Sequence, residues 1–284
     1  MNTATTAEPR VSAPDGTTGG SDRRAAQRVR RIVLPSLVLL AGLALWLTVT
    51  FVALDERRRF LLPPPWAVAH TGLIDPVSRA EIFAALTQTA TVALTGLLVA
   101  IVVGVTIAVL MSQARWVEES IYPYAVIVQT LPIVAIVPLV GLWLGFNFSS
   151  RVIVCVVMSL FPIITNTLFG LKSADPGLHD LATLHNASRW TRLRTIAFPN
   201  ALPAMFTGIR IAGGLSVIGA IVSDFFFRQG YPGIGRLLDI YRANLDYEGL
   251  IAAIFASSSL GIMVFWFIGW LGHRVTGAWT GADR

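Results

Sequence analysis

The stretch TVALTGLLVAIVVGVTIAVLM occupies residues 91–111 and contains no charged side chain. A helix needs about 20 consecutive apolar residues to cross the hydrocarbon core of a bilayer. The stretch therefore predicts a membrane-spanning helix. Further runs of the same kind occur along the chain, and together they predict six spans, at residues 32–54, 91–111, 122–144, 152–171, 205–227 and 250–271.

The composition agrees with a chain that lies mostly in lipid. Of the 284 residues, 54% are hydrophobic and 13% are charged, whereas soluble proteins average about 45–50% and about 25%. One cysteine and four histidines give no basis for a disulfide framework and little for a zinc site. The bases behind the net charge of +6 are spread between the apolar runs, so we expect the lipid bilayer, and no nucleic acid, as their partner. The predicted fold class is an all-α polytopic membrane protein.

An even number of spans places both chain ends on one side of the membrane. Arginines at 23–31 directly precede the first span, and such bases hold their end of a helix in the cytoplasm. We therefore expect an N-in, C-in orientation. The expected organisation is a disordered basic cytoplasmic tail over 1–31, a first span over 32–54, an extracytoplasmic Pro-rich linker with an interfacial helix over 55–90, a membrane core over 91–274 with a cytoplasmic loop over 172–204, and a cytoplasmic tail over 275–284.

The chain has no ATP-binding motif of its own. Lys172 is the only lysine and follows Leu171, so the phosphate-binding pattern G-x-x-x-x-G-K-[ST] cannot occur. The histidines fall in loops or at span ends, which does not favour a serine hydrolase. We expect neither an enzyme nor a cofactor or metal in this chain, and any ATP and Mg must be bound by a partner.

The longest cytoplasmic loop, 172–204, is rich in residues that begin and end helices. Asn186 can adopt the left-handed conformation that ends a helix, and Ser188 can cap a second one. Pro199 and Pro203 are expected to stop that second helix at the membrane. The pattern predicts a helix–turn–helix of fixed shape. An interfacial hairpin without a protein partner, whose arginines meet anionic lipid, is the alternative.

This loop resembles the EAA loop in the permease subunits of bacterial ABC importers. The residues that carry the resemblance are Asp180, Leu181 and Ala182 at the E-A-A positions, Asn186 at the glycine, Ala187 and Ser188 at the frequent Ala-Ser, and Pro199 and Pro203 in the closing element. The chain departs from the pattern with Asp for Glu, Leu for the first Ala and Asn for Gly. The resemblance implies that these residues couple the membrane subunit to an ATPase.

The resemblance extends over most of the chain. QTLPIVAIVPLVGLWLGF (129–146), SLFPIITNTLFGLKSADPGL (159–178) and GIRIAGGLSVIGAIVSDFF (208–226) are similar to the nitrate/sulfonate/taurine-type permeases. They come closest to the branch linked with thiamine-pyrimidine precursors and riboflavin. The resemblance implies a homodimer of this chain in the bacterial inner membrane, a cytoplasmic ABC ATPase dimer and an extracytoplasmic solute-binding protein. It implies the function of an importer permease.

Polar and small residues inside the predicted spans are the candidates for the transport path. Polar groups at membrane depth usually face the bundle interior or a wet path. The candidates for the path or gate are Gln129, Asn166, Thr167, Ser216 and Asp224. The first three can instead merely satisfy one another. Close helix packing is expected at Gly208, Ala212 and Ala220, which recur with Ser216 and Asp224 at every fourth residue. Packing within one chain and packing between two copies both remain open.

Two other functions compete with the importer. An ion-gradient-driven secondary transporter would use Asp224 as its ion site, but a lone membrane carboxylate and the absence of a visible repeat argue against it. A membrane-anchored scaffold that binds acidic partners through its bases is the other competitor.

Overall fold

The structure is a computed structural model that describes residues 19–227, 230 and 232–280. In this part of the chain every regular element is a helix. The chain divides into two compact units, Met1–Pro65 and Trp66–Arg284. The all-α prediction is therefore confirmed.

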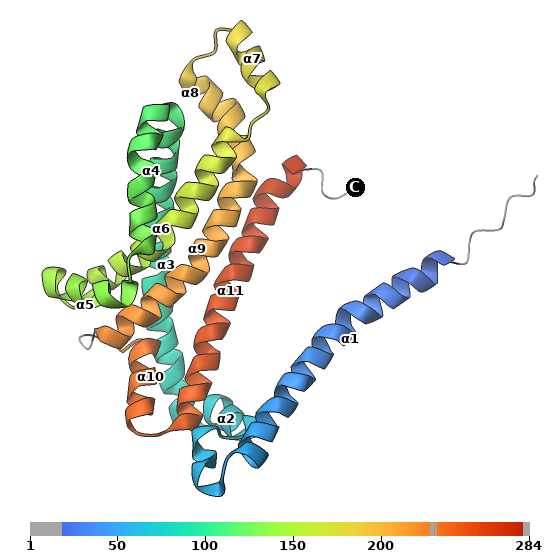
Figure 1. Ribbon diagram of the computed structural model, residues 1–284, viewed down its shortest axis with the longest axis vertical. Helices are drawn as coiled ribbons and strands as arrows, with labels where there is room; N and C mark the ends of the chain where they lie inside the picture. The colour runs from blue at the N-terminus through green and yellow to red at the C-terminus, as the bar shows by residue number, and fades with distance from the viewer. Residues whose placement is uncertain (1–18, 228–229, 231, 281–284) are drawn as a thin grey trace, which may run out of the picture. The chain divides into compact units, whose positions relative to one another are not determined.

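The first unit is built around one long helix, α1 (Gly19–Thr48) (Figure 1). It continues as the π-helical turn η1 (Val49–Ala53), and the 3₁₀ helix η2 (Glu56–Leu61) follows. The Trp46 indole N–H donates to the Pro63 carbonyl at 3.0 Å. This hydrogen bond ties the segment after the helix back to the end of the helix.

The start of α1 corrects the predicted tail. Residues 19–31 are helical, so the expectation of disorder is wrong for them, and residues 1–18 lie outside the described residues. The physical reason is that alanine, arginine and glutamine have high helix propensity. A helix nucleated in the apolar span extends into such residues at low cost.

The remaining helices follow one another from Pro65 onward (Figure 1). They are α2 (Pro65–Ala69), η3 (His70–Ile74), α3 (Pro76–Gln113), α4 (Arg115–Thr130), α5 (Ile133–Leu144), α6 (Phe148–Lys172), α7 (Pro176–Leu184), α8 (Arg189–Arg192), η4 (Leu193–Ala197), α9 (Phe198–Phe226), α10 (Ile234–Ala243) and α11 (Tyr247–Thr280).

Helix α9 lies at the centre of the second unit and packs against α6, α11 and α3. The predicted packing stripe forms its seam with α6: a Cβ on Gly208 would lie 2.5 Å from the Pro162 carbonyl oxygen. Ala212 and Ala220 have no exposed surface, and the Ser159 hydroxyl donates to the Ala212 carbonyl at 3.1 Å. Packing within one chain therefore accounts for the stripe.

Within the described residues, five helices are long and apolar enough to cross a membrane, and a bent helix pair makes a sixth candidate. The five are Val33–Ala53, Pro76–Gln113, Phe148–Lys172, Arg189–Phe226 and Tyr247–Gly277, and the pair is Arg115–Thr130 with Ile133–Leu144. The predicted polytopic architecture is confirmed. The last helix continues to Thr280, beyond the expected start of the C-terminal tail at 275.

The predicted span over 122–144 is not one continuous helix, because α4 and α5 meet at an angle of 99°. The break falls at Leu131 and Pro132. Proline has no backbone N–H and disfavours the helical conformation of the residue before it. Leu131 is accordingly extended, with φ −63° and ψ 132°.

The expected linker over 55–90 is also shorter in the structure. Helix α3 begins at Pro76, so the second half of the predicted interfacial helix is the first part of a long helix. The sequence encodes this start in a cap: the Asp75 carboxylate accepts the Ser78 N–H at 2.9 Å, and proline stands in the first turn. Hydrogen bonds from the Ser78 hydroxyl and N–H hold the pKa of Asp75 below its ordinary value.

Candidate functional site

Residues 176–197 form a helix–turn–helix, which we call the elbow. Helix α7 ends in a turn at Asn186, whose φ of 49° is left-handed. The second arm begins at Ser188, whose hydroxyl accepts the Thr191 N–H at 3.1 Å. Both expected conformations, the turn at Asn186 and the cap at Ser188, are confirmed. The short side chains of these residues allow them, because Asn tolerates positive φ and Ser accepts from the first turn.

The two prolines do not stop the second arm, which corrects the prediction. The chain passes from α8 through the π-helical turn η4 directly into α9. Pro199 stands in the first turn of α9 and Pro203 lies inside it. In the first turn the missing N–H matters least, and the π-turn instead closes with a hydrogen bond from the Phe198 N–H to the Leu193 carbonyl. The second arm of the elbow therefore continues into α9 as one helical rod.

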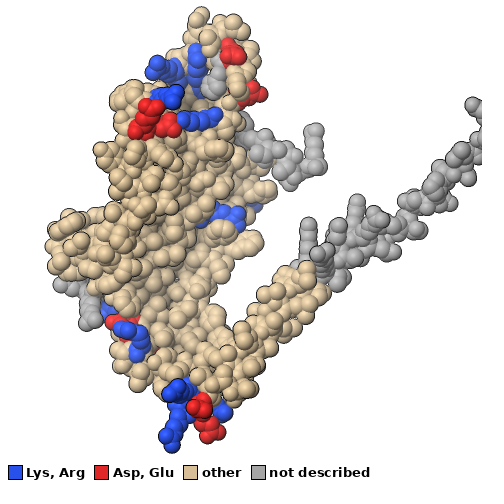
Figure 2. Space-filling view, viewed as in Figure 1, with Lys and Arg blue, Asp and Glu red and all other residues tan. Residues whose placement is uncertain are grey.

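Three large apolar side chains of the elbow are exposed. Leu181, Leu184 and Trp190 expose 52%, 78% and 68% of their surface. The elbow projects beyond the ends of α4 and α11 in the second unit (Figure 1), and charged side chains gather around its base (Figure 2). Exposed apolar residues on a surface rimmed with charge mark a site of interaction with a protein or with a membrane.

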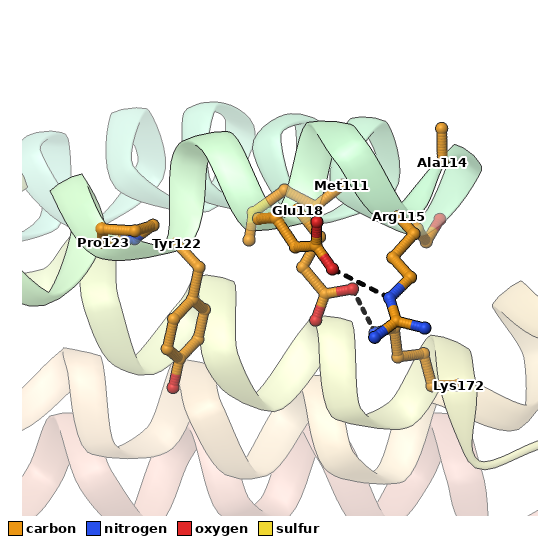
Figure 3. Close-up of a pocket in the computed structure, with 9 residues that line it drawn as sticks. Met111, Ala114, Arg115, Glu118, Tyr122, Pro123 and Lys172 are labelled. Atoms are coloured by element: carbon orange, nitrogen blue, oxygen red, sulfur yellow. Dashed lines mark hydrogen bonds and ion pairs between the residues drawn. The ribbon is translucent and has the colours of Figure 1, made fainter.

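An open cavity of about 670 Å³ lies at the root of the elbow, between the start of α4 and the end of α6 (Figure 3). Lys172 in the last turn of α6 forms an ion pair with Glu118 of α4. Arg115 Nε lies 2.8 Å from Glu119 Oε1 on the same wall. The first of these pairs ties α4 to the helix end from which the elbow begins.

A buried ion pair joins α6 to α9 at the other end of these helices. Arg151 Nη1 lies 2.8 Å from Asp224 Oδ1, and the two side chains are 7% and 0% exposed. Arg151 Nη2 also donates to the Phe227 carbonyl at 3.3 Å. Buried charges are tolerated when they are paired and hydrogen-bonded in this way.

Two further segments meet at the same carboxylate. The Thr89 hydroxyl of α3 donates to Asp224 Oδ2 at 2.6 Å and accepts the Ile234 N–H at 2.8 Å. A Cβ on Gly233 would lie 1.8 Å from Asp224 Oδ2, so only glycine fits at this point. The carboxylate thus fixes α3, α6, α9 and the start of α10 relative to one another.

Sequence reasoning missed Arg151, which it placed in a loop outside the membrane. The structure places the residue in the first turn of α6 and buries it. A signal was available: a buried carboxylate needs a cation, and Arg151 directly precedes the predicted span over 152–171.

The model of the family of binding-protein-dependent transport system inner membrane components matches residues 96–277. This range contains the elbow and both residues of the buried ion pair. The chain belongs to this family. The prediction drawn from the EAA-like loop is confirmed at the level of the family.

Individual relatives agree with the family. The formylaminopyrimidine transport permease protein of Halalkalibacterium halodurans is 32% identical over 231 residues, which cover 81% of this chain and 90% of the relative. The riboflavin transport system permease protein of Chloroflexus aurantiacus is 32% identical over 165 residues, which cover 58% of this chain and 60% of the relative. The predicted similarity to the nitrate/sulfonate-type permeases, including those for a thiamine precursor and riboflavin, is therefore confirmed.

A solved structure shares the fold. The crystal structure of an amino acid ABC transporter with histidines matches with a TM-score of 0.57 at 16% identity, covering 69% of this chain and 94% of that chain. With the family and the relatives, the chain is a permease of an ATP-driven importer and a multi-pass protein of the bacterial inner membrane. These findings do not support the ion-gradient alternative.

Among the residues that the structure describes, the predicted path residues of the permease form no hydrogen bond with one another. Asn166 donates to the Pro162 carbonyl of its own helix at 2.8 Å, and Ser216 donates to the Ala93 carbonyl at 2.7 Å. The buried Thr167 hydroxyl makes no hydrogen bond with a residue that the structure describes. Gln129 is exposed near the break between α4 and α5. Asn166 and Ser216 therefore each satisfy a backbone carbonyl.

Proposed function

We propose that the permease works as a homodimer in which each elbow docks on one subunit of a cytoplasmic ABC ATPase dimer. The observation that carries this proposal is the exposed apolar surface of Leu181, Leu184 and Trp190. Leu181 and Leu184 belong to α7, which projects beyond the ends of α4 and α11 (Figure 1). The coupling role belongs to the residues of the EAA-like pattern: Asp180, Leu181, Ala182, Asn186, Ala187, Ser188, Pro199 and Pro203.

The continuous helix from the elbow into α9 supports a mechanism for coupling. A push on the elbow, when ATP closes the partner subunits, moves α9 as a rod rather than through a flexible hinge. Asp224 at the far end of that rod transfers the movement to α6 and α3 through Arg151 and Thr89. Rigid-body rocking of the two permease copies would then expose the path to each side in turn.

In this proposal the remaining components come from partners. The ATPase subunits bind ATP and Mg, and this chain contributes no ATPase motif because its one lysine lies outside any phosphate-binding pattern. An extracytoplasmic binding protein delivers the solute. With the elbow in the cytoplasm, the permease has the N-in, C-in orientation. Two relatives are named for a formylaminopyrimidine and for riboflavin, so a small heterocyclic solute is one candidate.

Co-purification from native membranes tests the docking surface. We expect a tagged wild-type chain to retain its ATPase subunit in mild detergent and a Leu184→Glu variant to lose it, because the charge would be desolvated in the interface. Val275→Glu, a change of the same kind on α11, is the matched control and should retain the ATPase. Retention by Leu184→Glu, or loss in both variants, would contradict the docking role of the elbow.

A further inference from the structure

A second cavity lies beside the buried ion pair. Its volume is about 360 Å³. It is lined by Gln88 and Val92 of α3, by Phe146, Asn147 and Phe148 where α6 begins, by Arg151, and by Gly230 between α9 and α10. Sites for small molecules typically measure about 300–1,000 Å³. The cavity is therefore large enough for one small solute.

The position of the cavity suits a solute that arrives from outside. Arg151 and Lys172 lie near opposite ends of α6, about 30 Å apart at 1.5 Å per residue. This separation equals the thickness of the hydrocarbon core, about 30 Å. Since Lys172 stands at the root of the elbow, the cavity lies near the membrane face opposite the elbow.

The charge in the lining is already neutralised. Arg151 is the one cation among the lining residues that the structure describes. Its Nη1 binds the Asp224 carboxylate and its Nη2 donates to the Phe227 carbonyl. A small inorganic anion or a sulfonate would have to compete with a buried carboxylate for this guanidinium, so the cavity favours a neutral solute.

Aromatic rings form part of the wall. The Phe146 ring is held edge-on against Phe227, with centroids 5.3 Å apart. It also packs on Gly141, where a Cβ would lie 2.3 Å from the ring. Phe148 keeps 48% of its surface exposed. One ring fixed in place and one accessible ring favour a planar aromatic ligand, because aromatic groups pair in offset-stacked or edge-to-face arrangements.

One amide in the lining is left to recognise the solute. The two ends of the Asn147 amide are engaged, since its Oδ1 accepts the Ser150 N–H and its Nδ2 donates to the Leu144 carbonyl, both at 3.0 Å. The exposed Gln88 amide makes no hydrogen bond that involves another described residue. An amide offers one acceptor and two donors, which matches the edge of a nitrogen heterocycle.

We propose that this cavity is a solute-binding site of the permease itself, which takes a neutral planar nitrogen heterocycle against Phe146 and Phe148 and hydrogen-bonds its edge through Gln88. The proposal rests on the importer function proposed above. It adds a selective site inside the membrane subunit, in addition to the selection made by the binding protein.

Calorimetric titration of the purified permease–ATPase complex in lipid nanodiscs, without binding protein, tests the site. The probes are 4-amino-5-hydroxymethyl-2-methylpyrimidine and riboflavin, with taurine and nitrate as anionic comparisons. We expect at least one heterocycle to bind to the wild type, and neither anion to displace it. Gln88→Leu and Phe148→Ala should each weaken binding of that heterocycle about tenfold or more. Gln113→Leu, which changes the same residue type at the other end of α3, should bind like the wild type.

Three outcomes would overturn the proposed site: no binding of either heterocycle, equal affinity in Gln88→Leu and wild type, or displacement of the heterocycle by an anion. The same preparations separate this failure from failure of the importer function. If the ATPase still co-purifies through the elbow and hydrolyses ATP while no heterocycle binds, the importer function stands and only the site is wrong.

Discussion

The Arg151–Asp224 pair shows how one residue contact can hold several helices. Asp224 is fully buried and accepts hydrogen bonds from α3 and α6, while Gly233 lets the start of α10 approach it. Removing one partner of a buried ion pair leaves an uncompensated charge, which costs about 3–5 kcal/mol. Replacing both partners by apolar residues of similar volume can be neutral, because neither desolvation penalty then remains.

This difference gives a prediction for a double-mutant cycle. Arg151→Met alone should lower the free energy of unfolding by about 3–5 kcal/mol, and Asp224→Leu alone should also be destabilising. The double variant Arg151→Met/Asp224→Leu should lose less than the sum of the two single variants. Thermal unfolding of the detergent-purified proteins measures the cycle. Additive losses would show that the two side chains do not interact in the protein.

At the scale of elements, the break between α4 and α5 follows from Pro132. If proline causes the 99° bend, then Pro132→Ala should allow α4 to continue toward α5. Spin labels on cysteines that replace the exposed residues Arg115 and Trp143 should then show longer distances, because a straighter helix separates its ends.

Pulsed electron paramagnetic resonance measures this distance, and Pro138→Ala is the control. Pro138 lies inside α5, away from the break, so its replacement should leave the distance unchanged. Equal distance distributions in Pro132→Ala and wild type would show that packing of α5 on its neighbours, rather than the proline, sets the bend.

The same elements show what could be predicted from the sequence. The apolar runs, the turn at Asn186 and the cap at Ser188 depend on local chemistry, so the sequence predicts them correctly. The path through Pro199 and Pro203 could not be predicted, because proline ends a helix in one context and starts the next helical segment in another. The pairing of Arg151 with Asp224 depends on the packing of α6 against α9, which a single sequence does not encode locally.

At the scale of the whole molecule, the elbow and the turn after α10 should lie on opposite sides of the membrane. The helical stretch Arg189–Phe226 is a membrane-span candidate that separates them. The helix Tyr247–Gly277 then returns the chain to the side of the elbow. The orientation of the chain follows once the elbow, the turn after α10 or the end of α11 is assigned to one side of the membrane.

Cysteine labelling can show on which side of the membrane the elbow, the turn after α10 and the end of α11 lie. The one native cysteine, Cys155, has no exposed surface, so it should stay unlabelled and single cysteines can be added without replacing it. In intact spheroplasts a membrane-impermeant maleimide should label Asn244→Cys at once. It should label Ser173→Cys, at the exposed junction of α6 and the elbow, and Val275→Cys only after permeabilisation, because an ATPase can meet the elbow only in the cytoplasm. Labelling of Ser173→Cys in intact cells would place the elbow outside and exclude any coupling to ATP through it.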